Sequence, residues 1–186
     1  MEKSVALRDL FHRRWAMPAL AVLSRLRGAK FVTLHRELGA SVGSMRQAVD
    51  SLISTGLVMK NPGYGHPMRP EYVLTERGVA VGESCRDLWS ALSSLSACEV
   101  ALGKWSMPVV FALGDRKLRF GEIRSLCPAV TDRALTQSLK ALAVSGLVER
   151  SVEDTYPPTV SYRVARDARR LLPDLASLSE ALLVPS

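Results

Sequence analysis

Apolar residues recur at helical spacing in several stretches of the chain, and glycine-rich or polar segments separate these stretches. The clearest case is the run Leu135, Leu139 and Leu142, whose spacing of three and four residues places all three on one helical face. Thr131 precedes this run at the position of an N-cap, and Gly146 follows it where a left-handed C-cap is favoured. The pattern predicts an amphipathic helix between Thr131 and Gly146.

Shorter elements surround this predicted helix in a recognisable order. They are an apolar helix over Trp105–Leu113, an extended pair Leu118-Arg119, a short helix over Phe120–Leu126, and two strands over Leu147–Val152 and Thr159–Val164. The polar segment Glu153–Pro158 separates the strands and reads as the tip of a hairpin. Helix, helix, helix and hairpin in this order are typical of a winged helix-turn-helix, in which the third helix is the recognition helix and the hairpin is the wing.

A similar series of residues occurs 90 positions earlier. The matching residues are Trp15, Met17 and Pro18 with Trp105, Met107 and Pro108, then Gln47, Leu52, Gly56, Leu57 and Val58 with Gln137, Leu142, Gly146, Leu147 and Val148, then Tyr72 with Tyr162. A fixed offset over so many positions predicts two copies of one module in tandem.

The first copy shows the same predicted elements. They are an apolar helix over Trp15–Leu26, a supporting helix over Phe31–Leu38, a recognition helix over Val42–Thr55 with Ser41 as its N-cap, and an irregular wing over Asn61–Pro70. A further helix is expected before each tryptophan, within Met1–Arg14 and Ala97–Leu102.

Each wing is followed by an amphipathic stretch. Leu88, Leu92 and Leu95 mark one within Thr75–Leu102, and the leucines of Leu171–Leu183 mark the other. We expect these two helices to pack together near a pseudo-twofold axis, so that one chain imitates a dimer. The predicted fold class is mainly α with small β-hairpin wings, built from a first module (residues 1–82), a connecting amphipathic helix (83–103) and a second module with a C-terminal helix (104–186).

Residues 104–164 also carry a family resemblance. The strings that carry it are Lys104-Trp105, Phe120-Gly121-Glu122-Ile123, Leu135-Thr136-Gln137-Ser138-Leu139, Ser145-Gly146-Leu147-Val148-Glu149-Arg150, Tyr156-Pro157-Pro158 and Val160-Ser161-Tyr162. In this order and spacing the segment resembles the HxlR-type winged helix-turn-helix transcription regulators of bacteria. The resemblance implies DNA binding, and ordinary members resemble a single module that dimerises. The first copy matches more loosely, since Gly63–Pro70 stands in place of the Tyr-Pro-Pro segment.

The charge distribution agrees with a polyanionic partner. Residues 1–82 hold 12 Lys and Arg against 6 Asp and Glu, residues 104–186 hold 12 against 9, and the connector holds 1 against 3. Both modules are thus basic and the connector is not. No apolar run is long enough for a membrane span and no signal peptide is expected. Three cysteines without Cys-x-x-Cys spacing favour a reduced, cytoplasmic protein.

The candidate DNA-binding residues are the polar positions that face away from the apolar side of each recognition helix. In the second module these are Thr131, Arg133, Thr136, Gln137 and Lys140, and in the first they are Ser44, Arg46 and Gln47, with Arg69 added from the first wing. Arginine pairs with guanine, glutamine pairs with adenine, and threonine contacts a phosphate or a thymine methyl. Asp50 stands where Lys140 stands in the other copy, so unequal half-sites are expected. The alternative is that these residues are ordinary polar groups on solvated helices.

A ligand site is a second candidate. Trp15, Met17, Trp89, Trp105 and Met107 would line a cavity between the modules in which a flat apolar or aromatic effector stacks, the alternative being that they pack in the core. Cys127, at the end of the supporting helix, is either a redox-sensing thiol or a buried one. The three histidines lie far apart, so neither a metal site nor a cofactor is expected, and no catalytic constellation points to an enzyme.

The leading hypothesis is a sequence-specific, double-stranded DNA-binding transcriptional regulator, a repressor in its simplest form, whose two winged helices read two half-sites under the control of a small effector. The chain would act as a monomeric pseudo-dimer or as a homodimer. The alternative hypothesis keeps the scaffold and replaces regulation with sequestration of a small molecule, with weak or no specific DNA binding.

Overall fold

The computed structural model describes residues 2–63, 70–154, 156 and 158–184. The first half of the chain contains α1 (Glu2–Phe11), α2 (Ala16–Leu26), α3 (Phe31–Leu38), α4 (Val42–Ser54), β1 (Val58–Lys60), β2 (Tyr72–Leu74) and α5 (Glu76–Ser93). The second half contains α6 (Cys98–Ala101), α7 (Ser106–Leu113), β3 (Leu118–Arg119), α8 (Phe120–Leu126), α9 (Asp132–Val144), β4 (Val148–Glu153), β5 (Thr159–Val164), the 3-10 helix η1 (Arg166–Ala168) and α10 (Leu171–Ala181).

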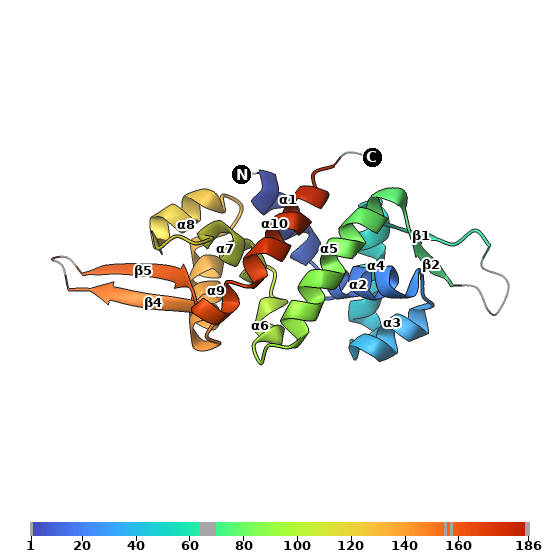
Figure 1. The fold of residues 1–186 in the computed structure, drawn as a ribbon, viewed down its shortest axis with the longest axis horizontal. Coiled ribbons are helices and arrows are strands. Elements are labelled where there is room, and N and C mark those ends of the chain that lie inside the picture. Colours follow the sequence, from blue (N-terminus) through green and yellow to red (C-terminus); the bar gives the residue numbers. More distant parts are fainter. Residues whose placement is uncertain (1, 64–69, 155, 157, 185–186) are drawn as a thin grey trace.

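In both halves four helices precede an antiparallel pair of strands, and a further helix follows the pair (Figure 1). The predicted fold class, mainly helical with small β-hairpin wings, is therefore confirmed. The predicted N-caps are also confirmed, because Ser41 accepts a hydrogen bond from the Ser44 N–H at 3.2 Å and Thr131 accepts one from the Ala134 N–H at 3.2 Å. Gly56 and Gly146 follow the two helices with φ of 69° and 75°, the left-handed conformation expected of them.

The connecting helix is shorter than the sequence pattern suggests. The helix after the first wing ends at Ser93, where the hydroxyls of Ser93 and Ser94 donate to the carbonyls of Ser90 and Ala91 at 3.2 and 2.9 Å. Serine side chains compete in this way for backbone groups and favour helix ends. The helices expected before the two tryptophans are both present, as the 10-residue α1 and as the single turn α6 within Ala97–Leu102.

The two sheets lie at opposite outer ends of the molecule (Figure 1). In the first half, β1 and β2 pair antiparallel with Val58 opposite Leu74, and Ala29 adds an isolated bridge to Tyr72. In the second half, the strand order is β3-β5-β4, and Leu118 pairs with Tyr162. Each sheet thus ties its wing to the segment between the first and second helices of its winged-helix unit.

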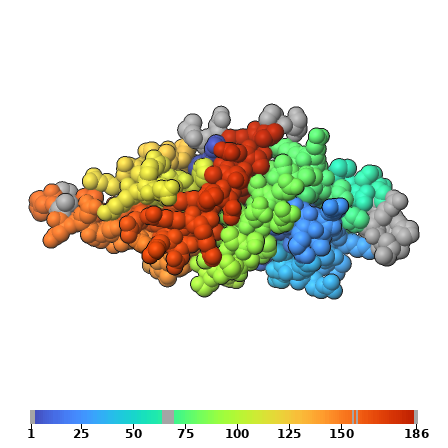
Figure 2. All heavy atoms as spheres, viewed as in Figure 1, coloured from blue at the N-terminus to red at the C-terminus, as the bar shows by residue number. Residues whose placement is uncertain are grey.

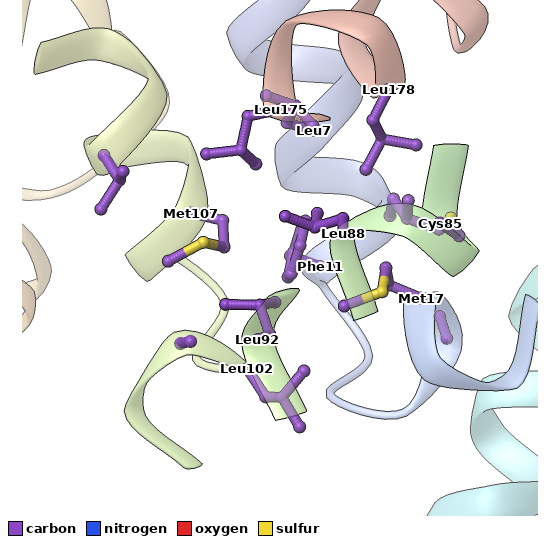
Figure 3. Close-up of a cluster of buried hydrophobic side chains, with 14 of the residues drawn as sticks. Leu7, Phe11, Met17, Cys85, Leu88, Leu92, Leu102, Met107, Leu175 and Leu178 are labelled. Atoms are coloured by element: carbon purple, nitrogen blue, oxygen red, sulfur yellow. The ribbon is translucent and has the colours of Figure 1, made fainter. Parts of the chain in front are cut away.

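One continuous core joins the two halves. The helices α5 and α10 pack against each other, as expected, and lie side by side across the middle of the face seen in Figure 2. The helix α1 packs against α2 of its own half and against α7 and α10 of the other. Leu7, Phe11, Leu88, Leu92 and Leu175 fill the space where these helices meet and are 0–1% exposed (Figure 3). Burying one such side chain contributes roughly 1.5–3 kcal/mol, so the halves stabilise each other.

Candidate nucleic-acid interface

The helix α9 has one apolar face and one polar face. Leu135, Leu139 and Leu142 are buried against the rest of the second half. The opposite face carries four exposed side chains of the type that reads DNA, which are Arg133, Thr136, Gln137 and Lys140. The helical repeat puts these residues on adjacent turns of one surface. The structure thus brings together the set predicted for the second module, with Thr131 at the N-terminal end of the helix.

The polar face of α9 has free hydrogen-bonding groups. Within the described residues, none of its four side chains has a hydrogen bond or an ion pair to another residue. The neighbouring Asp132 differs, because its carboxylate accepts a hydrogen bond from Arg124 Nε at 2.8 Å. This ion pair turns the one acidic group at the start of α9 toward α8. The remaining face is basic and offers both hydrogen-bond donors and acceptors. Base edges in the major groove present complementary donors and acceptors.

The equivalent face of α4 is exposed as well. Met45, Ala48, Val49 and Leu52 point into the core, and the polar side is built from Ser44, Arg46, Gln47 and Asp50. The predicted rotation of this helix is therefore correct.

Three of these four side chains, Ser44, Arg46 and Gln47, contact neighbours within the chain. The Ser44 hydroxyl accepts a hydrogen bond of 2.9 Å from Ser41, and the Arg46 guanidinium lies over the Phe31 ring at 5.6 Å. The Gln47 Oε1 accepts a hydrogen bond of 3.1 Å from Arg13. Sequence reasoning anticipated the residues of α4 but missed these contacts. The sequence does hint at the contact between Arg13 and Gln47. The residue 90 positions after Arg13 is Gly103, so the second copy lacks a side chain that could make the same contact.

Charged residues of the second wing form ion pairs within the protein. Arg163 forms an ion pair with Glu149 at 2.6 Å across the strands β4 and β5. Glu153 near the wing tip is bound by Lys117 at 2.7 Å, and this ammonium lowers the pKa of the carboxyl through the hydrogen bond and its charge. Glu153 therefore offers less repulsion to a phosphate than its sequence suggests. In the first wing, the candidate Arg69 lies outside the described residues.

The five candidate ligand-binding residues occupy different surroundings. Met17 and Met107 are 0% exposed and belong to the filled core between the halves (Figure 3). Trp15 and Trp105 occupy the N-cap positions of α2 and α7 and are half-buried, with Arg14 and Lys104 over their rings. Trp89, also half-buried, lines a surface groove of about 340 Å³ between α2, α3 and α5. The groove at Trp89 contains none of the other four candidates.

The cysteines are shielded. Cys127 is 3% exposed, and its thiol lies 3.9 Å from the Ser4 hydroxyl and 3.9 Å from the Pro108 carbonyl. Burial raises the pKa of Cys127, and it raises that of the fully buried Cys85 as well. In the described part of the chain, no group of three or more His, Cys, Asp or Glu side chains is arranged to hold a metal ion. No described helix is both long and apolar enough to span a membrane.

Comparison with known proteins agrees with this geometry. The family model HxlR-like helix-turn-helix matches residues 100–182, which contain α7 to α10. An uncharacterized HTH-type transcriptional regulator of Methanothermobacter thermautotrophicus is 40% identical over 90 residues, covering 46% of this chain and 69% of the relative. The uncharacterized HTH-type transcriptional regulator YybR of Bacillus subtilis is 37% identical over 82 residues, covering 44% of this chain and 66% of the relative.

Among solved structures, the redox regulator HypR in its oxidized form is 36% identical, with a TM-score of 0.42 and coverage of 44% of this chain and 84% of HypR. The similarity in sequence thus concerns less than half of this chain but about two thirds or more of the relatives described. On the residues it shares with the Methanothermobacter regulator, and on the match of residues 100–182, the chain belongs to the HxlR-like helix-turn-helix family.

Proposed function

We propose that the protein is a sequence-specific regulator of transcription that binds double-stranded DNA and represses promoters overlapping its site. The observation that carries this proposal is the polar face of α9, where Arg133, Thr136, Gln137 and Lys140 are exposed and have no partner within the described residues. These side chains make no contact that the fold needs, and their donors and acceptors match those of base edges.

The dimensions of α9 suit the major groove. Its 13 residues give a length of about 20 Å, and the groove of B-DNA is about 12 Å wide. Arg133, in the first turn, would donate to guanine, and Gln137 would pair with adenine one turn later. Thr131 and Lys140 would contact the phosphates that flank the groove.

The two halves would act together as a pseudo-dimer. Each half supplies a helix of 13 residues with an exposed polar face, and the shared core around α5 and α10 holds the two helices at a fixed separation. We propose that the halves derive from one duplicated module, that residues 1–82 and 104–186 are the two DNA-binding units, and that the chain works as a monomer on two unequal half-sites about one helical turn apart.

Selection of bound sequences from a random DNA pool tests the proposal, with the salt concentration stated because phosphate contacts make affinity salt-dependent. The expected result is a motif with a guanine and an adenine in one half. Arg133→Ala and Gln137→Ala should each relax the preference at one position, with a loss of about 1–3 kcal/mol of discrimination.

Gln47→Ala is the matched control, because Gln47 is the equivalent glutamine of the other half and is already bound to Arg13. It should change the motif less than Gln137→Ala. A wild-type protein that enriches no sequence, or an Arg133→Ala variant with an unchanged motif, would contradict the proposal.

The contacts of α4 favour a second candidate function, sequestration of a small apolar or aromatic molecule without specific DNA binding. Gln47 is hydrogen-bonded to Arg13 inside the protein, and Trp89 lines a groove large enough for a single ring system. Calorimetric titration with planar aromatic probes, compared between wild type and Trp89→Ala, tests this candidate. If the probe binds tightly to the wild type but not to Trp89→Ala, and no DNA sequence is enriched, sequestration replaces DNA binding as the leading function. If the DNA motif is found, the same groove becomes the candidate site of an effector.

A further inference from the structure

Four exposed basic residues gather where the two halves meet. His12, Arg13 and Arg14 form the turn between α1 and α2, and Lys104 directly precedes the N-cap residue of α7. The helix α1 leads into this turn and packs against both α2 and α7, the first helices of the two winged-helix units. We refer to His12, Arg13, Arg14 and Lys104 as the central basic surface.

The central basic surface lies beside the polar face of α4. Arg13 donates a hydrogen bond of 3.1 Å to Gln47, which is on the exposed side of that helix. Lys104 belongs to the other half, yet its charge acts on His12: together with partial burial, Lys104 and Arg13 lower the pKa of that imidazole. Arg14 also lies 3.5 Å from Glu99 on α6, in the other half, so the surface continues from α4 across the junction toward the start of the second winged-helix unit.

Arg14 and Lys104 are equivalent residues of the two halves. They are 90 positions apart, and each places its cationic group over the ring of the tryptophan that follows, at 5.7 Å for Trp15 and 5.4 Å for Trp105. A cation over an aromatic face can still bind a second partner through the N–H donors that point away from the ring. Two such cations at matching points of the two halves suit a ligand that contacts both halves in the same way.

Acidic residues neutralise only part of this charge. Asp9 is engaged by Arg8, and Glu99 lies 3.5 Å from Arg14 with its side chain 90% exposed. Arg13 and Lys104 have no acidic partner in the portion of the chain that the structure describes. An excess of positive charge is therefore exposed at the junction of the two winged-helix units. The regularly spaced phosphates of a continuous polyanion would neutralise it best.

We infer that the central basic surface binds the DNA backbone between the two segments that α4 and α9 read. This inference rests on the proposed function. It extends that function by assigning a third contact, sequence-independent and located at the junction, whose residues lie outside the recognition helices and the wings. Its role is to position the duplex on both helices at once.

The salt dependence of DNA binding by the full chain tests the inference. Each phosphate contact to duplex DNA contributes about 0.9 to the slope of log K against log salt. The double variant Arg14→Ala/Lys104→Ala should therefore lower the magnitude of the slope by about 2, while the selected motif stays the same. Ethylation of the phosphates between the half-sites should interfere with binding by the wild type and lose its effect on the double variant.

The matched control is Arg86→Ala/Arg169→Ala, which removes the same charge from exposed positions on α5 and just before α10. It should leave the slope within about 0.5 of the wild-type value. Equal slopes for the two double variants, with both folded by circular dichroism, would overturn the inference even if the wild type reads a specific motif. If the wild type enriches no motif, the proposed function fails, and the slopes measured on a random duplex still decide whether this surface contacts phosphate.

Discussion

The guanidinium of Arg13 donates a hydrogen bond of 3.1 Å to Oε1 of Gln47, and this contact distinguishes the two recognition helices. The residue equivalent to Arg13 in the second half is Gly103, which has no side chain, so Gln137 stays without a partner among the described residues. Adenine recognition uses both the acceptor and the donor of a glutamine amide. Because Oε1 of Gln47 already accepts from Arg13, the two side chains together offer mainly N–H donors. Such donors suit guanine or a phosphate.

Replacing Arg13 with glycine should make the first half read DNA as the second does. Arg13→Gly frees Oε1 of Gln47, and we expect a new preference for adenine at one position of the first half-site, with about 1–3 kcal/mol of discrimination. Sequence selection with the variant measures it. Arg14→Gly, at the next position of the same turn, is the control and should weaken binding without a new base preference. An unchanged motif in Arg13→Gly would show that the pair does not set specificity.

The fold was largely predictable because its determinants are local in sequence. The leucine spacing of α9, the caps Ser41 and Thr131 and the turn glycines Gly56 and Gly146 act within a few residues, and the structure agrees with each of them. The end of α5 at Ser93 was not predicted, since the hydroxyls of Ser93 and Ser94, which donate back to their own helix, leave no mark in apolar periodicity.

Which side chains of the candidate site have partners within the protein was less predictable, because this depends on contacts between distant segments. Exposure of Arg133 and Gln137 followed from helical rotation alone. The engagement of Gln47 by a residue 34 positions away did not. The methionines show the same limit, since Met17 and Met107 face a core that α1, α5 and α10 fill, and periodicity cannot tell such a position from a cavity wall.

The shared core predicts that the two halves unfold together. Leu88 is 0% exposed and lies among side chains from both halves (Figure 3). Leu88→Ala removes these contacts and leaves a cavity, so we expect the free energy of unfolding to fall by about 2–5 kcal/mol in one cooperative transition. Denaturant unfolding followed by circular dichroism and by tryptophan fluorescence measures it.

The control for Leu88→Ala is Val144→Ala, at a position that is 83% exposed, and it should change the stability by less than about 0.5 kcal/mol. Two separate transitions, of which Leu88→Ala shifts only one, would contradict a shared core.

The cysteines should react slowly in the native protein. The thiolate is the reactive form, and burial raises the pKa of Cys85, Cys98 and Cys127. Cys98 is only half-buried, so a disulfide-exchange reagent at pH 8 should modify it first, with Cys85 and Cys127 following at the rate of unfolding. Mass spectrometry of the labelled peptides over time follows the order. Rapid labelling of Cys127 in folded protein would instead support a redox-sensing role for that thiol.

DNA affinity should depend on pH through His12. In the free protein, partial burial and the positive charges of Lys104, Arg13 and Arg8 lower the pKa of His12 below 6.5, while Asp9 acts in the opposite direction. Phosphates bound at the central basic surface would offset those positive charges and raise the pKa. The complex would then hold more protons than the free protein at pH values between the two pKa values.

Affinity should therefore rise as pH falls through that window and level off below the pKa of the free protein. The gain is at most about tenfold for each unit by which binding raises the pKa. Fluorescence anisotropy titrations between pH 5.5 and 8 at constant ionic strength would measure the effect. His12→Asn should remove it, whereas His35→Asn, on α3, should not. An equal pH dependence in wild type and His12→Asn would place the titrating group elsewhere and count against phosphate binding beside His12.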